Sequence, residues 1–94
     1  MYTIEFNKQS KKDFKNINKS DIQFLYDSLS LFASSFSHDY EASLMQSGKI
    51  KKLQGQKEIL YRLKLRSYRI IYKKEDIKLV IYVVHVTTRE GTYK

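Results

Sequence analysis

The chain has 94 residues, of which 41% are hydrophobic and 14% aromatic, so it is suited to one small folded domain and not to a disordered tail. It contains no cysteine, which excludes disulfides, thiolate nucleophiles and cysteine metal sites and fits a reducing compartment. We expect no secretion signal at its N-terminus, and its longest uncharged apolar run, residues 79–84, is too short to span a membrane. We therefore expect a soluble, cytoplasmic protein.

The net charge of +8 is unevenly distributed along the chain. Residues 1–46 hold five lysines against six acidic residues, whereas residues 47–94 hold thirteen lysines and arginines against four acidic residues. Such an excess in one half favours a polyanionic partner, which could be a nucleic acid, a membrane surface or an acidic protein. Solvated lysines alone can produce the same charge, so the charge by itself leaves the partner open.

The first residues predict a half-buried strand, because apolar and polar side chains alternate over residues 2–7. The next segment, Ser10–Asp13, has the form of a capping box with aspartate in place of glutamate, and it predicts the start of a short helix. This helix would show Phe14 and Ile17 on one face.

A second, longer helix is predicted after a turn at residues 18–19, with Ser20 as its N-cap. Its apolar residues recur at three- and four-residue steps and form a stripe suited to packing on a sheet: Ile22, Leu25, Leu29, Phe32 and Phe36. The two helices would form a hairpin. For residues 36–50 we expect a loop with a partial third helix around residues 41–46, after which residues 51–55 lead towards the sheet.

The C-terminal half predicts three strands joined by tight turns. Apolar and basic residues alternate on both sides of a turn at Ser67, and a second turn at residues 73–76 leads to a mostly apolar central strand over residues 77–86. The expected fold is α+β, a single domain over residues 1–94. It has an N-terminal strand, a two-helix hairpin and a three-stranded antiparallel run, with the helices packed on one face of the sheet.

The other face of the sheet is expected to be open and basic, because residues two apart in a strand project from the same side. Six residues with cationic or hydrogen-bond donor groups could converge on it: Arg62, Lys64, Arg66, Arg69, Arg89 and Tyr93. The first three would form one cationic row. Alternating basic residues can also serve only to keep an exposed sheet face soluble, and spacing alone does not exclude this.

Such a surface suits cleavage of an RNA phosphodiester by its own 2′-hydroxyl. The reaction needs a base for the 2′-hydroxyl, cations for the extra negative charge on phosphorus, and an acid for the leaving 5′-oxygen. Arginine donates bidentately to phosphate, and lysine or tyrosine can act as the base where neighbouring cations lower the pKa. No metal is required, and no metal-ligand set or glycine-rich phosphate loop stands out, so we expect no cofactor. We expect His85, in the central strand, to be a hydrogen-bonded structural residue.

The sequence resembles the RelE/ParE toxin superfamily over nearly its whole length, apart from about residues 36–50. The likeness rests on the order and spacing of residues 52–55 (Lys-Leu-Gln-Gly), 60–72, 79–86 and 89–93, and on the first strand and helix at residues 2–6 and 12–15. The resemblance implies the same α+β fold. It also implies a RelE-type toxin of a bacterial type II toxin–antitoxin system, an endoribonuclease that cleaves mRNA in the ribosomal A site without a metal.

The resemblance further implies the site. The positions that match the catalytic motif are Arg62, Lys64, Arg69, Arg89 and Tyr93. Lys64 and Arg69 would stabilise the transition state, Arg89 would assist the leaving group, and Tyr93 would orient or stack on the base. Further candidates for RNA binding are Lys51, Lys52, Arg66 and Lys73.

Two positions depart from the family pattern. Arg62 replaces the first lysine of the motif, and arginine is a poor general base, so the residue that takes the proton is not identified. Thr88 stands where many members have a histidine directly before the arginine that Arg89 matches. This argues against the relatives that cut RNA with a histidine base at that position.

The implied partners are mRNA, the ribosome and a RelB-like antitoxin whose acidic, flexible segment wraps the basic domain; the chain would be a monomer or part of a toxin–antitoxin hetero-oligomer. Two alternatives remain. A ParE-type toxin shares the fold and acts on DNA gyrase, and a catalytically silent domain would use its basic groove only to bind an antitoxin or nucleic acid. The set of lysine, arginine and tyrosine residues favours the ribonuclease.

Overall fold

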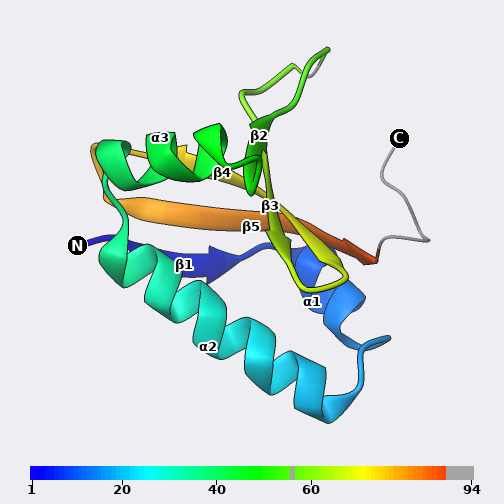
Figure 1. The fold of residues 1–94 in the computed structure, drawn as a ribbon. Helices are drawn as coiled ribbons and strands as arrows, with labels where there is room; N and C mark the ends of the chain where they lie inside the picture. Colours follow the sequence, from blue (N-terminus) through cyan, green and yellow to red (C-terminus); the bar gives the residue numbers. More distant parts are fainter. Residues whose placement is uncertain (56, 89–94) are drawn as a thin grey trace.

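The computed structural model describes residues 1–55 and 57–88. Within these residues the chain order is β1 (Thr3–Phe6), α1 (Lys8–Phe14), α2 (Lys19–Ser35), α3 (His38–Gln46), β2 (Ile50–Lys52), β3 (Tyr61–Leu65), β4 (Tyr68–Glu75) and β5 (Val80–Thr88) (Figure 1). The strands form one sheet in the order β1-β5-β4-β3-β2. β1 runs parallel to β5, and all other neighbours are antiparallel. The predicted α+β class is confirmed.

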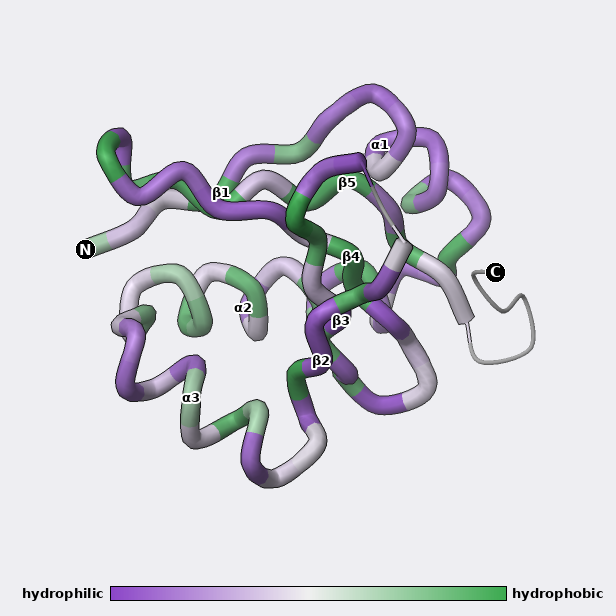
Figure 2. The backbone as a smooth tube through the Cα atoms, turned by 90° about the horizontal axis from the view of Figure 1, so that it is seen from above, coloured by the Kyte–Doolittle hydropathy of each residue, from purple (hydrophilic) through white to green (hydrophobic). Residues whose placement is uncertain are grey.

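The core lies between the sheet and the helices. Figure 2 shows α2 and α3 on the same side of the strands, and the predicted stripe of α2 is buried there, with Leu25 and Leu29 at most 1% exposed. Replacing either leucine with alanine costs about 2–5 kcal/mol in typical cores. Helix α1 contributes Phe14 to this core but also borders β5 directly, since the side chain of Asp13 accepts a hydrogen bond from the backbone nitrogen of Val86 at 2.8 Å.

Both N-terminal helices begin before their predicted caps. Asn7 caps α1, and its side chain accepts a hydrogen bond from the backbone nitrogen of Ser10 at 2.9 Å. Asn18 caps α2 in the same way through the backbone nitrogen of Asp21. The predictions of Ser10 and Ser20 as the N-caps are therefore wrong. The physical reason is that asparagine caps a helix as well as serine does and comes earlier in each segment.

Two further elements differ from expectation. The third helix is complete from His38 to Gln46, with Ser37 as its N-cap, and not a partial turn at residues 41–46. Strand β2 was not expected, because three residues are too few to show an alternating pattern. The sheet thus has five strands where the sequence predicted four.

The last hairpin determines which residues of β5 face the core. β4 extends to Glu75, so the predicted turn at residues 73–76 lies too early, and the chain reverses before Val80 with Leu79 at φ 56°. Within the β4–β5 ladder Tyr72 pairs with Val83 whereas Ile71 pairs with His85, which leaves one extra residue in β5. This bulge turns His85 towards the face of the sheet opposite to the core.

No helix in the described part of the chain is both long and apolar enough to cross a bilayer.

Candidate functional site

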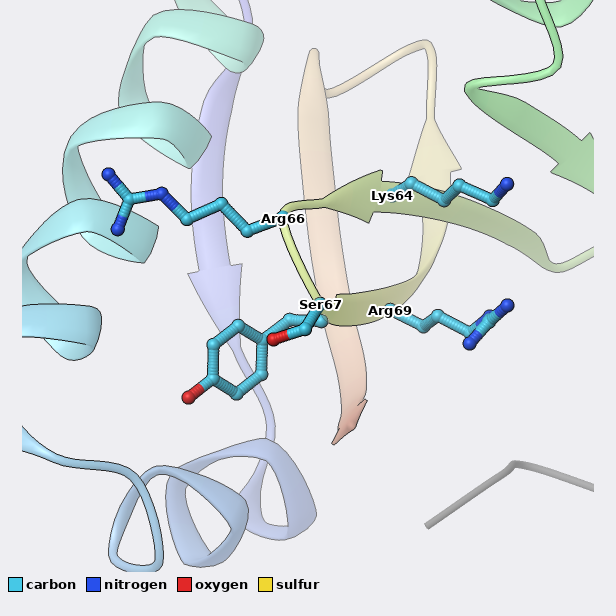
Figure 3. A pocket seen from close by; sticks show the side chains of 5 residues that line it. Lys64, Arg66, Ser67 and Arg69 are labelled. Carbon is cyan, nitrogen blue, oxygen red and sulfur yellow. The ribbon is translucent and has the colours of Figure 1, made fainter. Parts of the chain in front are cut away.

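The sheet face opposite to the core, called the open face below, carries side chains in two cross-strand rows. In the first row Lys64 of β3 stands directly opposite Arg69 of β4, and Thr87 of β5 stands next to Arg69. The second row consists of Lys51, Arg62, Ile71 and His85. Side chains directly opposite on one face have Cβ atoms about 4.5–5.5 Å apart. Figure 3 shows Lys64 and Arg69 extending side by side in the same direction.

Arg66 does not join this row, although the alternation of the sequence places it there. Its backbone has φ 57°, which ends the strand at the hairpin and reverses the direction of the side chain. The guanidinium carbon lies 3.6 Å from the centre of the Phe24 ring, and Nη1 lies 3.7 Å from Asp21 Oδ1 (Figure 3). The predicted row of three cations is therefore wrong at its third member. The hairpin itself encloses a small polar hollow of about 170 Å³.

An open groove of about 370 Å³ lies beside the paired cations. It is lined by Lys51, Lys52, Leu53, Gln54, Arg62, Arg69 and Ile71. Ile71 is 1% exposed and sits between its cross-strand neighbours Arg62 and His85. The apolar floor and cationic walls suit a ligand that combines flat rings with phosphate groups.

Arg62 is held rigidly at this groove. Its Nη2 donates to the carbonyl of Gly48 at 2.8 Å, and its buried Nε has no hydrogen-bond partner among the described residues. Burial, followed by the charge of Arg69, lowers the pKa of Arg62 below the ordinary value for arginine. An arginine remains charged under these conditions, so Arg62 supplies a fixed positive charge with one donor unused.

The remaining predicted residues are more scattered. Lys51 lies on the open face opposite Arg62, whereas Lys52 stands opposite Tyr61, whose ring packs towards the core. Lys73 forms an ion pair with Glu58 at 2.8 Å. The hydrogen bond to Glu58 raises the pKa of Lys73 against the opposing effect of burial. Arg89 and Tyr93 lie outside the described residues.

The structure adds one contact that the sequence did not predict. Asp13 of α1 places Oδ2 2.6 Å from Nδ1 of His85, and the same oxygen accepts from the backbone nitrogen of Val86 at 2.8 Å. A hydrogen-bonded His85 is thus confirmed, and its partner is Asp13. In the sequence Asp13 fits a capping box, and no local signal connects it to a strand 72 residues away. Among the described residues no group of three or more histidine or acidic side chains is placed to hold a metal ion.

Comparison with solved structures finds this arrangement of helices and strands in RelE toxins and in a further toxin. Three examples cover almost the whole chain. For the intact RelBE toxin–antitoxin complex from E. coli, identity is 24%, the match covers 100% of this chain and 99% of that chain, and the TM-score is 0.66. For the RelE–RelB complex of the archaeon Pyrococcus horikoshii, identity is 23%, the match covers 97% of this chain and 98% of that chain, and the TM-score is 0.67. For a metal-bound toxin from Helicobacter pylori, identity is 18%, the match covers 99% of this chain and 100% of that chain, and the TM-score is 0.70.

Neither a protein-family model nor a curated protein matches the chain. The likeness in three dimensions nevertheless extends over complete chains on both sides, and it includes the helices and the sheet that position the open face. The chain therefore has the fold of the RelE toxins.

Proposed function

We propose that the chain is the toxin of a type II toxin–antitoxin system and acts as a metal-independent endoribonuclease on mRNA in the ribosomal A site. The observation that carries this proposal is the direct pairing of Lys64 with Arg69 on the open face of a sheet with the RelE fold. Two adjacent cations on a rigid hairpin form a preorganised site for a phosphate that gains negative charge in the transition state.

Each cation of the open face has a role in this proposal. Lys64 and Arg69 contact the scissile phosphate and stabilise the pentavalent transition state. Arg62, anchored on the carbonyl of Gly48, adds a third positive charge from the groove. Arg89 would assist the leaving group and Tyr93 would orient or stack on the base, as the family resemblance implies.

The RNA strand would follow the groove. Lys51 and Lys52 line it, and Lys73 extends the positive surface further along the open face, so these residues would contact flanking phosphates. Arg66, which packs on Phe24, would stabilise the hairpin and not bind the same strand.

The proposed protein partner is a RelB-like antitoxin with an acidic segment, and the proposed location is the cytoplasm. Two of the similar structures are complexes of a RelE toxin with its antitoxin. The net charge of +8 and the cations of the open face would attract such a segment and would be covered by it. Binding of this kind would block the same surface that takes RNA.

The test is induced expression in bacteria, followed by primer extension on an abundant transcript. We expect growth arrest and cuts inside codons, and these cuts should occur only when the transcript is translated. Both the arrest and the cuts should disappear in Arg69→Ala and in Arg89→Ala. Growth arrest with intact transcripts would favour the gyrase-directed toxin. No arrest would leave a domain that only binds its partner.

A further inference from the structure

The contact between Asp13 and His85 joins an acidic helix residue to the open face. The side chain of Asp13 is 13% exposed and that of His85 is 28% exposed, so both are partly shielded from water. Asp13 is fixed by a second hydrogen bond from the backbone of Val86, at the edge of β5 beyond the end of β1. A carboxylate on Nδ1 places the ring proton on that nitrogen and makes Nε2 the nitrogen whose lone pair can take a proton.

The register of the strands brings this imidazole near the phosphate-binding cations. His85 is directly opposite Ile71, and Arg69 is the next residue of β4 on the same face. Diagonal neighbours of this kind have Cβ atoms within about 7–8 Å, which a phosphodiester group can bridge. Arg62 stands two strands away in the row of His85, about 10 Å distant at the usual strand spacing.

The proposed reaction lacks a base among the residues assigned so far. Arg62 replaces the lysine of the motif and retains its proton, and Thr88 replaces the histidine that many relatives carry. The chain has two histidines, and His38 lies on α3, where it contacts Asp76 at 3.6 Å. His85 is thus the one imidazole on the open face.

We infer that His85 is the general base of the ribonuclease and that Asp13 is its positioning residue; this inference rests on the function proposed above. Nε2 of His85 takes the proton of the 2′-hydroxyl, and the 2′-oxygen forms a bond to phosphorus. The bond from phosphorus to the 5′-oxygen breaks, and this oxygen takes a proton from a water molecule. The hydroxide that remains is neutralised by the proton that His85 releases to the solvent, which restores the neutral imidazole. The products are a 2′,3′-cyclic phosphate and a 5′-hydroxyl. Asp13 stabilises the imidazolium that forms and keeps the ring oriented.

Three charged groups lie around His85. Asp13 faces it from α1, Arg69 lies diagonally opposite on β4, and Arg62 lies in the same cross-strand row on β3. A histidine base loses activity when its ring is protonated, and histidine changes charge between about pH 5 and 8. Cleavage by the wild-type chain should therefore increase with pH in this range.

The experiment measures single-turnover cleavage of mRNA in programmed ribosomes by the full chain, as a function of pH. We expect His85→Gln to reduce the rate about 100-fold or more and to remove its increase with pH. The matched control His38→Gln should retain the rate and pH profile of the wild type. Circular dichroism and the Tm show whether each variant is folded.

Two further measurements separate a base from other roles. In an RNA with sulfur in place of the bridging 5′-oxygen, the leaving group needs no acid, but the 2′-hydroxyl still needs a base. Cleavage of this RNA by His85→Gln should therefore remain slow. Rescue by this substrate would identify His85 as an acid and overturn the inference. Asp13→Asn retains an acceptor for Val86, and we expect it to lower kcat with KM unchanged; an unaltered kcat would overturn the role of Asp13.

The outcomes also separate this inference from the proposed function. If the wild type cleaves and His85→Gln cleaves at the same rate, the inference is wrong and the ribonuclease proposal stands. If the wild-type chain cleaves no RNA in ribosomes, both are wrong.

Discussion

Arg66 and Arg69 are three residues apart on one hairpin and lie on opposite sides of it. Arg69 stands opposite Lys64 on the open face, whereas Arg66 lies over Phe24 on the helix side. The two arginines are therefore a matched pair, since they share chemistry and neighbourhood but only one faces the proposed phosphate site.

We expect Arg69→Ala to reduce RNA cleavage about 100-fold or more, because a preorganised donor to the transition state is lost. Arg66→Ala should leave cleavage unchanged and lower the free energy of unfolding by about 0.5–1 kcal/mol, since a cation–π contact is lost. Primer extension and urea denaturation measure the two effects. An equal loss of cleavage in both variants would contradict the assignment of Arg69 to the site.

Tyr2 and Asp76 form a second residue-level contact, away from the open face. The hydroxyl of Tyr2 donates to Oδ1 of Asp76 at 2.6 Å. This hydrogen bond, together with burial, raises the pKa of Tyr2 to about 12, and the same bond lowers the pKa of Asp76. The contribution of Asp76 to stability is present above the ordinary aspartate value of about 3.9 and is lost as the pH falls through the lowered value. The contribution of Tyr2 to stability is present below about pH 10 and is lost as the pH rises towards 12.

We expect Tyr2→Phe to raise the pKa of Asp76 towards its ordinary value, because the largest contribution to its lowering is removed. NMR titration of the Asp76 carboxyl measures this shift. His38→Gln removes a weaker contact to the same carboxylate and should produce a smaller change. A larger shift in His38→Gln than in Tyr2→Phe would show that the hydrogen bond from Tyr2 is not the main cause.

At the scale of elements, a buried polar cluster attaches α3 to β4. Glu41 is 5% exposed and accepts hydrogen bonds from the Tyr72 hydroxyl and from Nζ of Lys74, both at 2.6 Å. Burial and the bond to Glu41 raise the pKa of Tyr72. Burial opposes the charge of Lys74, but the bond to Glu41 and its charge together raise the pKa of Lys74. The carboxylate therefore satisfies two polar groups that are shielded from water, the hydroxyl of Tyr72 and the ammonium of Lys74.

We expect Glu41→Gln to lower the free energy of unfolding by about 1–3 kcal/mol, because Lys74 then keeps a shielded charge without a counterion. Tyr72→Phe should cost about 1 kcal/mol. Urea denaturation measures both, with the exposed Asp39→Asn on the same helix as a control. The double variant Glu41→Gln/Lys74→Met should recover part of the loss; no recovery would show that the ion pair is not its origin.

At the scale of the whole molecule, the charge of +8 and the open face predict how RNA binding depends on salt. Each phosphate neutralised on a single strand contributes about 0.7 to the slope of log K against log salt concentration. The three central contacts, from Arg62, Lys64 and Arg69, contribute about −2 to this slope, and the flanking contacts from Lys51, Lys52 and Lys73 add to it.

We expect Arg69→Ala to reduce this slope in magnitude by about 0.7, as one phosphate contact is lost. Fluorescence anisotropy with a short RNA that carries a 2′-deoxy sugar at the cleavage position measures binding without cleavage. Arg66→Ala serves as the control and should keep the wild-type slope. A slope near zero in the wild type would exclude phosphate contacts as the basis of binding.

The sequence by itself determined the features that depend on short-range backbone geometry. The alternation of β1, β3 and β4, the buried stripe of α2 and the placement of Lys64 and Arg69 on one face of the sheet all follow from periods of two or about four residues. These periods specify which side chains share a face, so the fold class and the central cations of the candidate site could be predicted from them.

Only the tertiary structure decided the features that depend on long-range pairing. Arg66 leaves the open face because of a positive φ at the turn, and His85 joins it because the β4–β5 ladder contains a bulge. Asp13 contacts His85 because β1 ends at Phe6, so α1 and not a strand lies against the edge of β5 beyond that point. One extra residue in a strand exchanges its faces, and no local pattern records where the partner strand or helix will lie.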